Sequence, residues 1–221
     1  FVVGQTGDDI NEYTLSTAFD VSTASYAGNS ERFNFSSQEG KPGELVFNND
    51  GTKMFLTGNG GDDVNEYNLS TAFDVSTASF VDSFSVQSEE DDPRGLAFNN
   101  DGTKMFVTGF TDRKVNEYTL STAFDVSTAT FLDSLNVSSE DTVPSSLKFN
   151  RDGTKMFVLG QNGDDVNEYT LSCPFKVTSS STCDDPADTS DEGKDITSSI
   201  ESQTATAKQI AIQASTPVLN R

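Results

Sequence analysis

The pentapeptide Gly-Thr-Lys-Met-Phe occurs three times, with 51 residues from each copy to the next, at residues 51–55, 102–106 and 153–157. The tripeptide Asn-Glu-Tyr keeps the same spacing, at residues 65–67, 116–118 and 167–169. A further copy at 11–13 lies 54 residues before the next one, and the three extra residues fall between Tyr26 and Phe33. A fixed period of this length is typical of repeat proteins in which each unit is one supersecondary structure.

Each repeat is predicted to form four short β-strands separated by turns. In the third repeat, the Asp-Gly pair at 101–102 supplies the positive φ of a tight hairpin. The expected strands of this repeat cover residues 94–98, 104–108, 115–120 and 130–137. Strand alternation places Tyr118 and Leu120 on one face of the sheet and Val115 on the other. Apolar residues at helical spacing are missing, so the sequence predicts an all-β fold of four-stranded antiparallel units.

The repeat also resembles a known family. Phe-Asn-Asn-Asp-Gly-Thr-Lys-Met-Phe-Val resembles the hairpin of YVTN and WD40-like propeller repeats, and Val-Asn-Glu-Tyr is similar to the strand that follows it. The complete unit resembles near-identical repeats of marine bacteria and tailed phages, which are often predicted to be surface or tail-fibre-like. The resemblance covers about residues 1–180. It implies a β-propeller of four-stranded blades, each a repeat of about 51 residues.

About four blades are expected within residues 1–183, and the first of them is incomplete. Phe1-Val2-Val3-Gly4 aligns with Phe55-Leu56-Thr57-Gly58, so the chain starts inside a second strand. We expect a fragment of a larger ring, and a compact four-blade closure is the alternative.

The C-terminal part differs in composition from the repeats. Residues 184–194 are acidic and polar and are predicted to be a linker, and residues 195–221 form a tail. In the tail, isoleucines, alanines and one glutamine follow heptad spacing at Ile196, Ile200, Gln203, Ala207, Ile210 and Ala214. The pattern predicts a short oligomerising helix or coiled coil. The alternatives are a single helix packed on the last blade, or a strand at 210–212 that completes the first blade.

Charge and composition exclude several classes of function. The 221 residues carry 14 Lys+Arg against 35 Asp+Glu, a net charge of −21 that argues against nucleic acid and anionic membranes as partners. The chain has no His, which rules out Ser-His-Asp and Cys-His catalysis and His-ligated metals within it. Its two Cys, Cys173 and Cys183, lie in the last repeat and are predicted to form a disulfide, with two free thiols as the alternative. The resemblance to surface and tail-fibre-like proteins implies an extracellular or virion-surface location, which favours the disulfide.

Acidic pairs recur in the loop between the second and third strands of a repeat. They include Asp62 with Asp63 and Asp164 with Asp165, which are candidate calcium ligands because calcium prefers oxygen. A complete calcium-binding ladder is missing, and the third repeat carries cations in this loop. We expect these residues to shape the turn, and no cofactor is predicted; calcium is the alternative.

Binding residues are expected where the repeats disagree, because the shared residues are needed for folding. Lys41 and the insertion around residues 29–32 are two such places. The remaining places where the repeats disagree are predicted to lie in loops, and their residues are the candidate binding residues. They are Glu89, Glu90, Asp91, Asp92, Arg94, Asp112, Arg113, Lys114 and Arg151.

These patterns predict a surface-exposed structural or binding module without catalytic activity, part of a phage virion appendage or a secreted adhesin. Its expected partners are a protein or glycan surface, and other copies of the chain through the C-terminal tail. The alternative is an architectural spacer or self-assembling element that binds no ligand. A polysaccharide hydrolase is a more remote alternative, since Glu66, Glu117 and Glu168 recur in every complete repeat as scaffold residues do.

Overall fold

A computed structural model describes residues 1–178 and Cys183. The chain divides into two compact units after Cys183, and only the first, Phe1–Cys183, lies within the described part. The predicted linker at 184–194 and the predicted helical tail at 195–221 lie outside the described residues.

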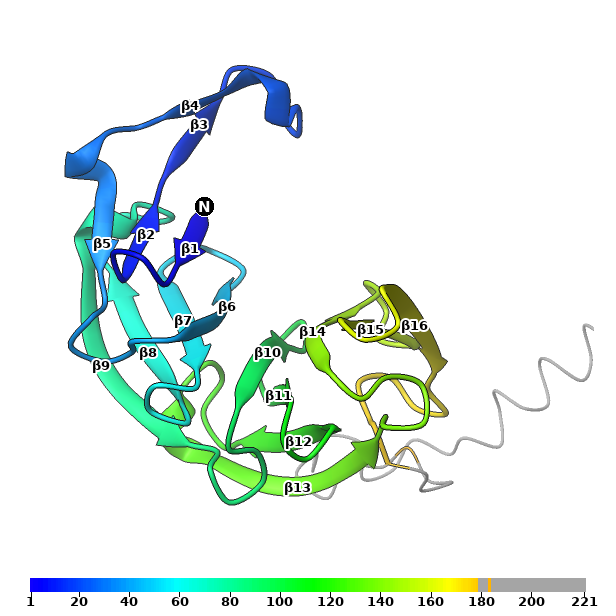
Figure 1. The fold of residues 1–221 in the computed structure, drawn as a ribbon. Coiled ribbons are helices and arrows are strands. Elements are labelled where there is room, and N and C mark those ends of the chain that lie inside the picture. Colours follow the sequence, from blue (N-terminus) through cyan, green and yellow to red (C-terminus); the bar gives the residue numbers. More distant parts are fainter. Residues whose placement is uncertain (179–182, 184–221) are drawn as a thin grey trace, which may run out of the picture. The chain divides into compact units, whose positions relative to one another are not determined.

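The second and third repeats each form a four-stranded antiparallel sheet, whose strands follow one another in chain order (Figure 1). The strands of the second sheet are β6 (Pro42–Phe47), β7 (Lys53–Gly58), β8 (Asp63–Leu69) and β9 (Ala78–Ser85). The strands of the third are β10 (Pro93–Phe98), β11 (Lys104–Gly109), β12 (Lys114–Leu120) and β13 (Ala129–Asn136). The predicted all-β fold with four antiparallel strands is confirmed here, and the predicted bounds of the third sheet agree to within one residue.

The first and last sheets have three described strands each. They contain β1 (Val2–Gly4), β2 (Asp9–Asn11) and β5 (Arg32–Asn34) in the first, and β14 (Pro144–Phe149), β15 (Lys155–Gly160) and β16 (Asp165–Thr170) in the last. The three-residue insertion divides the outer strand of the first repeat. As a result, β3 (Tyr13–Leu15) and β4 (Ala24–Tyr26) form a separate two-stranded sheet.

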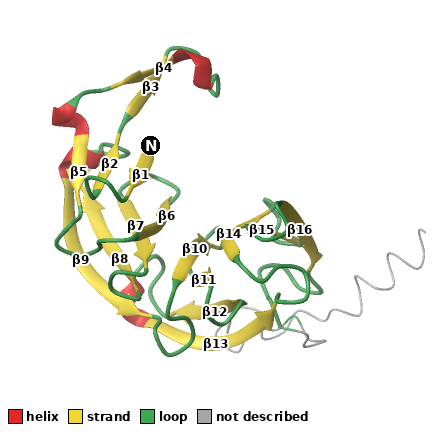
Figure 2. Ribbon diagram, viewed as in Figure 1, coloured by secondary structure: helices red, strands yellow, loops and turns green. Residues whose placement is uncertain are grey.

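Short 3-10 helices lead into the outer strands (Figure 2). They are η1 (Val21–Thr23), η2 (Asn29–Glu31), η3 (Val75–Thr77) and η4 (Val126–Thr128). In η1, η3 and η4, an aspartate caps the first turn by accepting the N–H of a serine two residues later, as Asp125 accepts that of Ser127. The repeated Phe-Asp-Val-Ser-Thr sequence thus forms the same turn in each of these repeats.

The Asp-Gly hairpins have the predicted turn geometry. Gly51, Gly102 and Gly153 have φ values of 72°, 76° and 70°, a region that costs glycine little. A phenylalanine ring of the same repeat packs against each glycine, and a Cβ on Gly102 would lie 2.2 Å from the ring of Phe124. Neighbouring hairpins are also linked, because the Asn100 side chain donates a hydrogen bond to the Arg151 carbonyl at 2.8 Å and Asn49 donates to that of Asn100.

The hydrophobic core lies between neighbouring sheets. The inner strands β6, β10 and β14 contact one another in sequence order. Phe55 and Phe106 are completely buried and pack on Phe98 and Phe149 of the next sheet, with ring centroids 4.6 Å apart in both pairs. None of the strand pairings among residues 1–178 joins the first sheet to the last.

The predicted faces of this strand are confirmed, because Tyr118 and Leu120 pack in one core cluster and Val115 packs in another. In β12, Val115, Asn116, Glu117 and Tyr118 are all buried, so neither face of the strand is open to solvent. Neighbouring sheets cover both of its faces, and such a strand has no solvent side.

The predicted disulfide between Cys173 and Cys183 is confirmed. Closing this short loop should stabilise the last repeat by about 2–3 kcal/mol. Alkylation of the denatured chain without reductant should add no label in an intact-mass measurement, and reduction should allow two labels. Two labels without reductant would show that the thiols are free.

The disulfide is compatible with an extracellular location. Within the described residues, no helix is long and apolar enough to span a membrane.

Candidate functional site at the inner strands

The beginning of each inner strand is a place where the repeats differ. The proline that starts the strand is shared, as Pro42, Pro93 and Pro144. The residue before it is Lys41, Asp92 or Val143, and the residue after it is Gly43, Arg94 or Ser145. In all three sheets the pairing register shifts just after the proline. Such a bulge redirects a side chain, and the variable residue sits in it.

A second variable position lies at the same end of the sheets. It immediately follows the second strand of each repeat and is occupied by Gln5, Asn59, Phe110 and Gln161. The two positions border a cavity of about 470 Å³, to which all four repeats contribute. Its polar lining residues are Gln5, Lys41, Asn59, Asp92, Arg94, Ser145 and Gln161. We call this cavity the inner pocket.

Arg94 is held in one orientation in the inner pocket. Its Nε and Nη2 donate to the two oxygens of Asp92 at 3.2 and 2.9 Å, and its Nη1 donates to Oε1 of Gln161 at 3.2 Å. The guanidinium lies 4.9 Å from the centroid of the Phe110 ring. Lys41 is the second cation of the pocket, and its Nζ donates to Oδ1 of Asn59 at 3.3 Å. The pocket therefore combines two cations, one of them paired with the Asp92 carboxylate, with amide and hydroxyl groups.

Three buried carboxylates hold the loops around the pocket: Glu39, Glu90 and Asp141, at the same position in successive repeats. Glu90 accepts the N–H groups of Asp92, Thr111 and Asp112 at 3.0, 2.9 and 3.1 Å. It thereby joins the loop before β10 to the loop after β11. Burial raises the pKa of Glu90, and the three N–H groups act against that increase.

Glu44 connects sheets that are not neighbours. Its carboxylate accepts a hydrogen bond from Oγ of Ser146 at 2.6 Å and pairs with Nζ of Lys148 at 2.7 Å. Gly95 lies on the intervening strand, and a Cβ there would come within 2.8 Å of the Ser146 Cα. The missing side chain allows the inner strands to approach closely.

The candidate binding residues lie in three different places. Asp92 and Arg94 line the inner pocket, and Glu90 is buried beneath it. Asp91 is exposed, whereas Glu89 is partly buried and its Oε2 lies 3.5 Å from the Tyr118 hydroxyl. Asp112 and Arg113 belong to the loop after β11, at the pocket end of the sheet, and Lys114 is the first residue of β12. Arg151 is exposed in the hairpin at the opposite end.

The acidic pairs have the backbone geometry of a shared turn. Asp8, Asp62 and Asp164 have φ values of 50°, 51° and 52°, and Arg113 at the same position has 57°. Asp63 accepts a hydrogen bond from the Asn65 side chain, and burial raises its pKa. The described residues contain no group of three acidic, Cys or His side chains that could hold a metal ion. Asp62, Asp63, Asp164 and Asp165 therefore have a structural explanation that needs no ion.

Several solved structures share this fold. A protein from Bacteroides fragilis, whose name proposes 6-phosphogluconolactonase activity, is 14% identical with a TM-score of 0.54, and the match covers 74% of this chain and 44% of that one. One from Bacteroides uniformis with a similar name is 14% identical with a TM-score of 0.51, covering 76% and 52%. A protein from Lactobacillus plantarum is 16% identical with a TM-score of 0.53, covering 74% and 45%. The chain thus spans about half the length of the structures it matches.

These likenesses establish a propeller-like fold for this chain. No protein-family model and no curated protein sequence matches it.

The comparisons overturn the predicted function. We expected a non-catalytic phage appendage or adhesin module, with an architectural spacer or a polysaccharide hydrolase as alternatives. Two of the matched structures carry the name of a lactone-hydrolysing enzyme, and none of the three is named as a phage or adhesion protein. The expectation of no catalytic activity is corrected as well. It rested on the missing His and on carboxylates repeated in every blade, and neither observation bears on a pocket of unlike residues.

Proposed function

We propose that the inner pocket binds a sugar-acid lactone carrying an anionic group and accelerates its hydrolysis. The observation that supports this most is the convergence of unlike polar residues from all four repeats on one cavity. A shared scaffold produces identical residues at equivalent positions, whereas these positions vary between repeats, apart from the glutamine that the first and last repeats share. The fold shared with proteins named as 6-phosphogluconolactonases suggests the substrate class.

The pocket has the groups that such a ligand needs. The guanidinium of Arg94 and the ammonium of Lys41 suit an anionic substituent or a carbonyl oxygen that gains charge during the reaction. The amides of Gln5 and Asn59 and the hydroxyl of Ser145 suit sugar hydroxyls. The net charge of −21 repels an anion at long range, so these local cations have to provide the attraction.

Lactone hydrolysis requires no His. The oxygen of a water molecule bonds to the carbonyl carbon, the ring C–O bond breaks, and a proton moves from the water to the departing ring oxygen. In our proposal the Asp92 carboxylate accepts that proton and passes it on. Arg94 stabilises the negative charge on the carbonyl oxygen, and Asp92 also fixes its orientation. The disulfide further supports an extracellular location for this reaction.

The test is the rate at which the chain releases acid from 6-phosphogluconolactone, followed by titration at constant pH. The wild-type chain should exceed the spontaneous rate. Arg94→Gln should lower kcat/KM by about 100-fold, because it removes the fixed positive charge at the carbonyl oxygen.

Arg151→Gln is the matched control. It removes the same charge from the exposed hairpin at the other end of the last sheet and should leave kcat/KM unchanged. A wild-type rate equal to the spontaneous rate would refute the proposal. An equal loss in the two variants would show that only the overall charge matters.

A further inference from the structure

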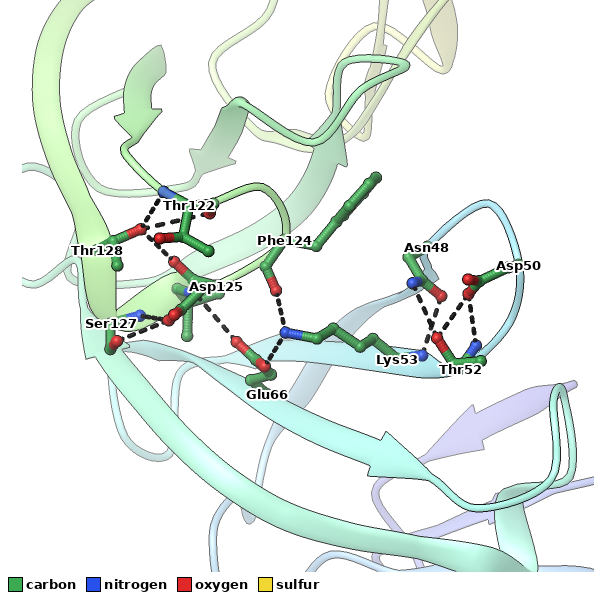
Figure 3. A network of polar contacts seen from close by, with 11 residues as sticks. Asn48, Asp50, Thr52, Lys53, Glu66, Thr122, Phe124, Asp125, Ser127 and Thr128 are labelled. Carbon is green, nitrogen blue, oxygen red and sulfur yellow. Dashed lines mark hydrogen bonds and ion pairs between the residues drawn. The ribbon is translucent and has the colours of Figure 1, made fainter.

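The same contact joins the second sheet to the third and the third to the fourth, and Figure 3 shows it between the second and third sheets. Lys53 and Glu66 of the second sheet form an ion pair at 2.6 Å. The Nζ of Lys53 also donates to the Phe124 carbonyl at 2.7 Å, and the other oxygen of Glu66 accepts the N–H of Val126 at 3.0 Å. We call residues 122–126 and their equivalents the anchor loop, and the Lys–Glu pair that receives the loop the socket.

The contact recurs between the fourth and third sheets. Lys104 and Glu117 form the socket at 2.9 Å. The Phe175 carbonyl accepts a hydrogen bond from Lys104 at 3.1 Å, and the N–H of Val177 donates to Glu117 at 2.9 Å. Between the second and first sheets, the equivalent Val75 is buried in one core cluster with Ile10 of the first sheet. Two consecutive interfaces therefore use one geometry, and the anchor-loop valine is buried at the third as well.

Each occupied contact is buried. The anchor-loop valines Val75, Val126 and Val177 are 0%, 0% and 4% exposed. The side chains of Glu66 and Glu117 are 2% and 0% exposed. Exposure of these groups therefore reports whether a neighbouring sheet is present.

The anchor loop of the first repeat and the socket of the last repeat are both exposed. In the first repeat, Val21 of the anchor loop at residues 17–21 is 82% exposed. In the last repeat, the socket side chains Lys155 and Glu168 are 44% and 48% exposed. Beside this socket, Val166 is 59% exposed, whereas Val64 and Val115 at the same position are completely buried. The socket of the last sheet holds no anchor loop among the described residues.

We propose that the anchor loop of one copy of this chain docks into the Lys155–Glu168 socket of a second copy, so that copies associate head to tail. The Phe19 carbonyl would accept from Lys155, and the N–H of Val21 would donate to Glu168, as in the internal contacts. Val21 and Val166 would become buried. This inference does not depend on the proposed function.

The free anchor loop already has the conformation of the docked ones. Phe19 has a φ of 61°, against 60° for Phe73 and 55° for Phe124. Asp20 caps η1 as Asp74 and Asp125 cap their helices. Docking therefore requires little ordering of the loop, which lowers its entropic cost.

The test is the mass of the wild-type chain in solution, measured by analytical ultracentrifugation at micromolar concentration. About 0.3 M salt should be present, because the two copies repel each other through their net charge. We expect a concentration-dependent dimer of the 23.8 kDa chain. Val21→Asp on the loop side and Glu168→Ala on the socket side should each weaken association at least about tenfold.

Val81→Ser is the control, because it removes an exposed apolar side chain from β9, away from both surfaces. Mixing the Val21→Asp and Glu168→Ala variants should restore a dimer, since one intact loop and one intact socket remain in the mixture. A wild-type chain that stays monomeric, or a dimer that survives both substitutions, would overturn the proposal. Failure of the mixture to associate would exclude the head-to-tail arrangement.

Discussion

Replacing Glu117 with alanine should lower the free energy of unfolding by about 3–5 kcal/mol. The Glu117 carboxylate is completely buried, pairs with Lys104 and accepts the N–H of Val177 from the next sheet. Removing it leaves a buried ammonium group without this counter-charge and a buried N–H without its acceptor, and both are costly. Guanidinium chloride denaturation followed by circular dichroism would measure the change.

Glu168→Ala is the matched control, because the repeat provides the same residue in another setting. Glu168 pairs with Lys155 in the same way, but both side chains are largely exposed. Its replacement should cost less than about 1 kcal/mol in a chain diluted enough to be monomeric. Equal losses in the two variants would contradict the role that we assign to burial and to the anchor loop.

Gly102→Ala should destabilise the fold by about 2–4 kcal/mol. An alanine at φ 76° is strained, and its Cβ would overlap the ring of Phe124. The ring has to move to relieve the overlap, and it packs on Phe98 with centroids 5.5 Å apart. The disturbance should therefore reach the core between the second and third sheets.

Thermal unfolding of this variant can be compared with that of Gly4→Ala. Gly4 lies in β1 and has no positive φ, and a Cβ added to it would meet open space. Its replacement should leave the melting temperature nearly unchanged. If Gly102→Ala melted at the wild-type temperature as well, the contact between Phe124 and the hairpin would not support the fold.

The strands and hairpins could be predicted from sequence because their causes are local. The Asp-Gly turn at 101–102 and the β-branched residues of Lys104–Gly109 determine a hairpin without help from distant residues. The burial of Val115 through Tyr118 could not be predicted in this way. It depends on neighbouring sheets that cover both faces of β12, and the sequence of a single repeat does not show which surfaces pack on it.

The candidate site was predictable only in part. Asp92, Arg94 and Lys41 stood out as departures from the repeat, but Gln5, Asn59 and Gln161 did not. These amides follow a different strand, and only the strand register brings them beside Arg94. Glu39 and Asp141 were missed too, although their 51-residue spacing from Glu90 was a usable signal. The sequence analysis did expect binding where the repeats disagree, but it inferred the absence of catalysis from the missing His and from the carboxylates that recur.

The side-chain amide of Asn49 donates a hydrogen bond to the Asn100 carbonyl, and that of Asn100 donates to the Arg151 carbonyl, so consecutive hairpin turns are linked along one edge of the sheets. A tandem duplication of the repeat copies the donor and the acceptor of this hydrogen bond together, so the new repeat can form the same bond to its neighbour. At the opposite end of the sheets, the residues that border the inner pocket vary between repeats, and the bond from Arg94 to Gln161 is made by two of these variable residues. Duplication can therefore lengthen the array while single substitutions at that end change what it recognises.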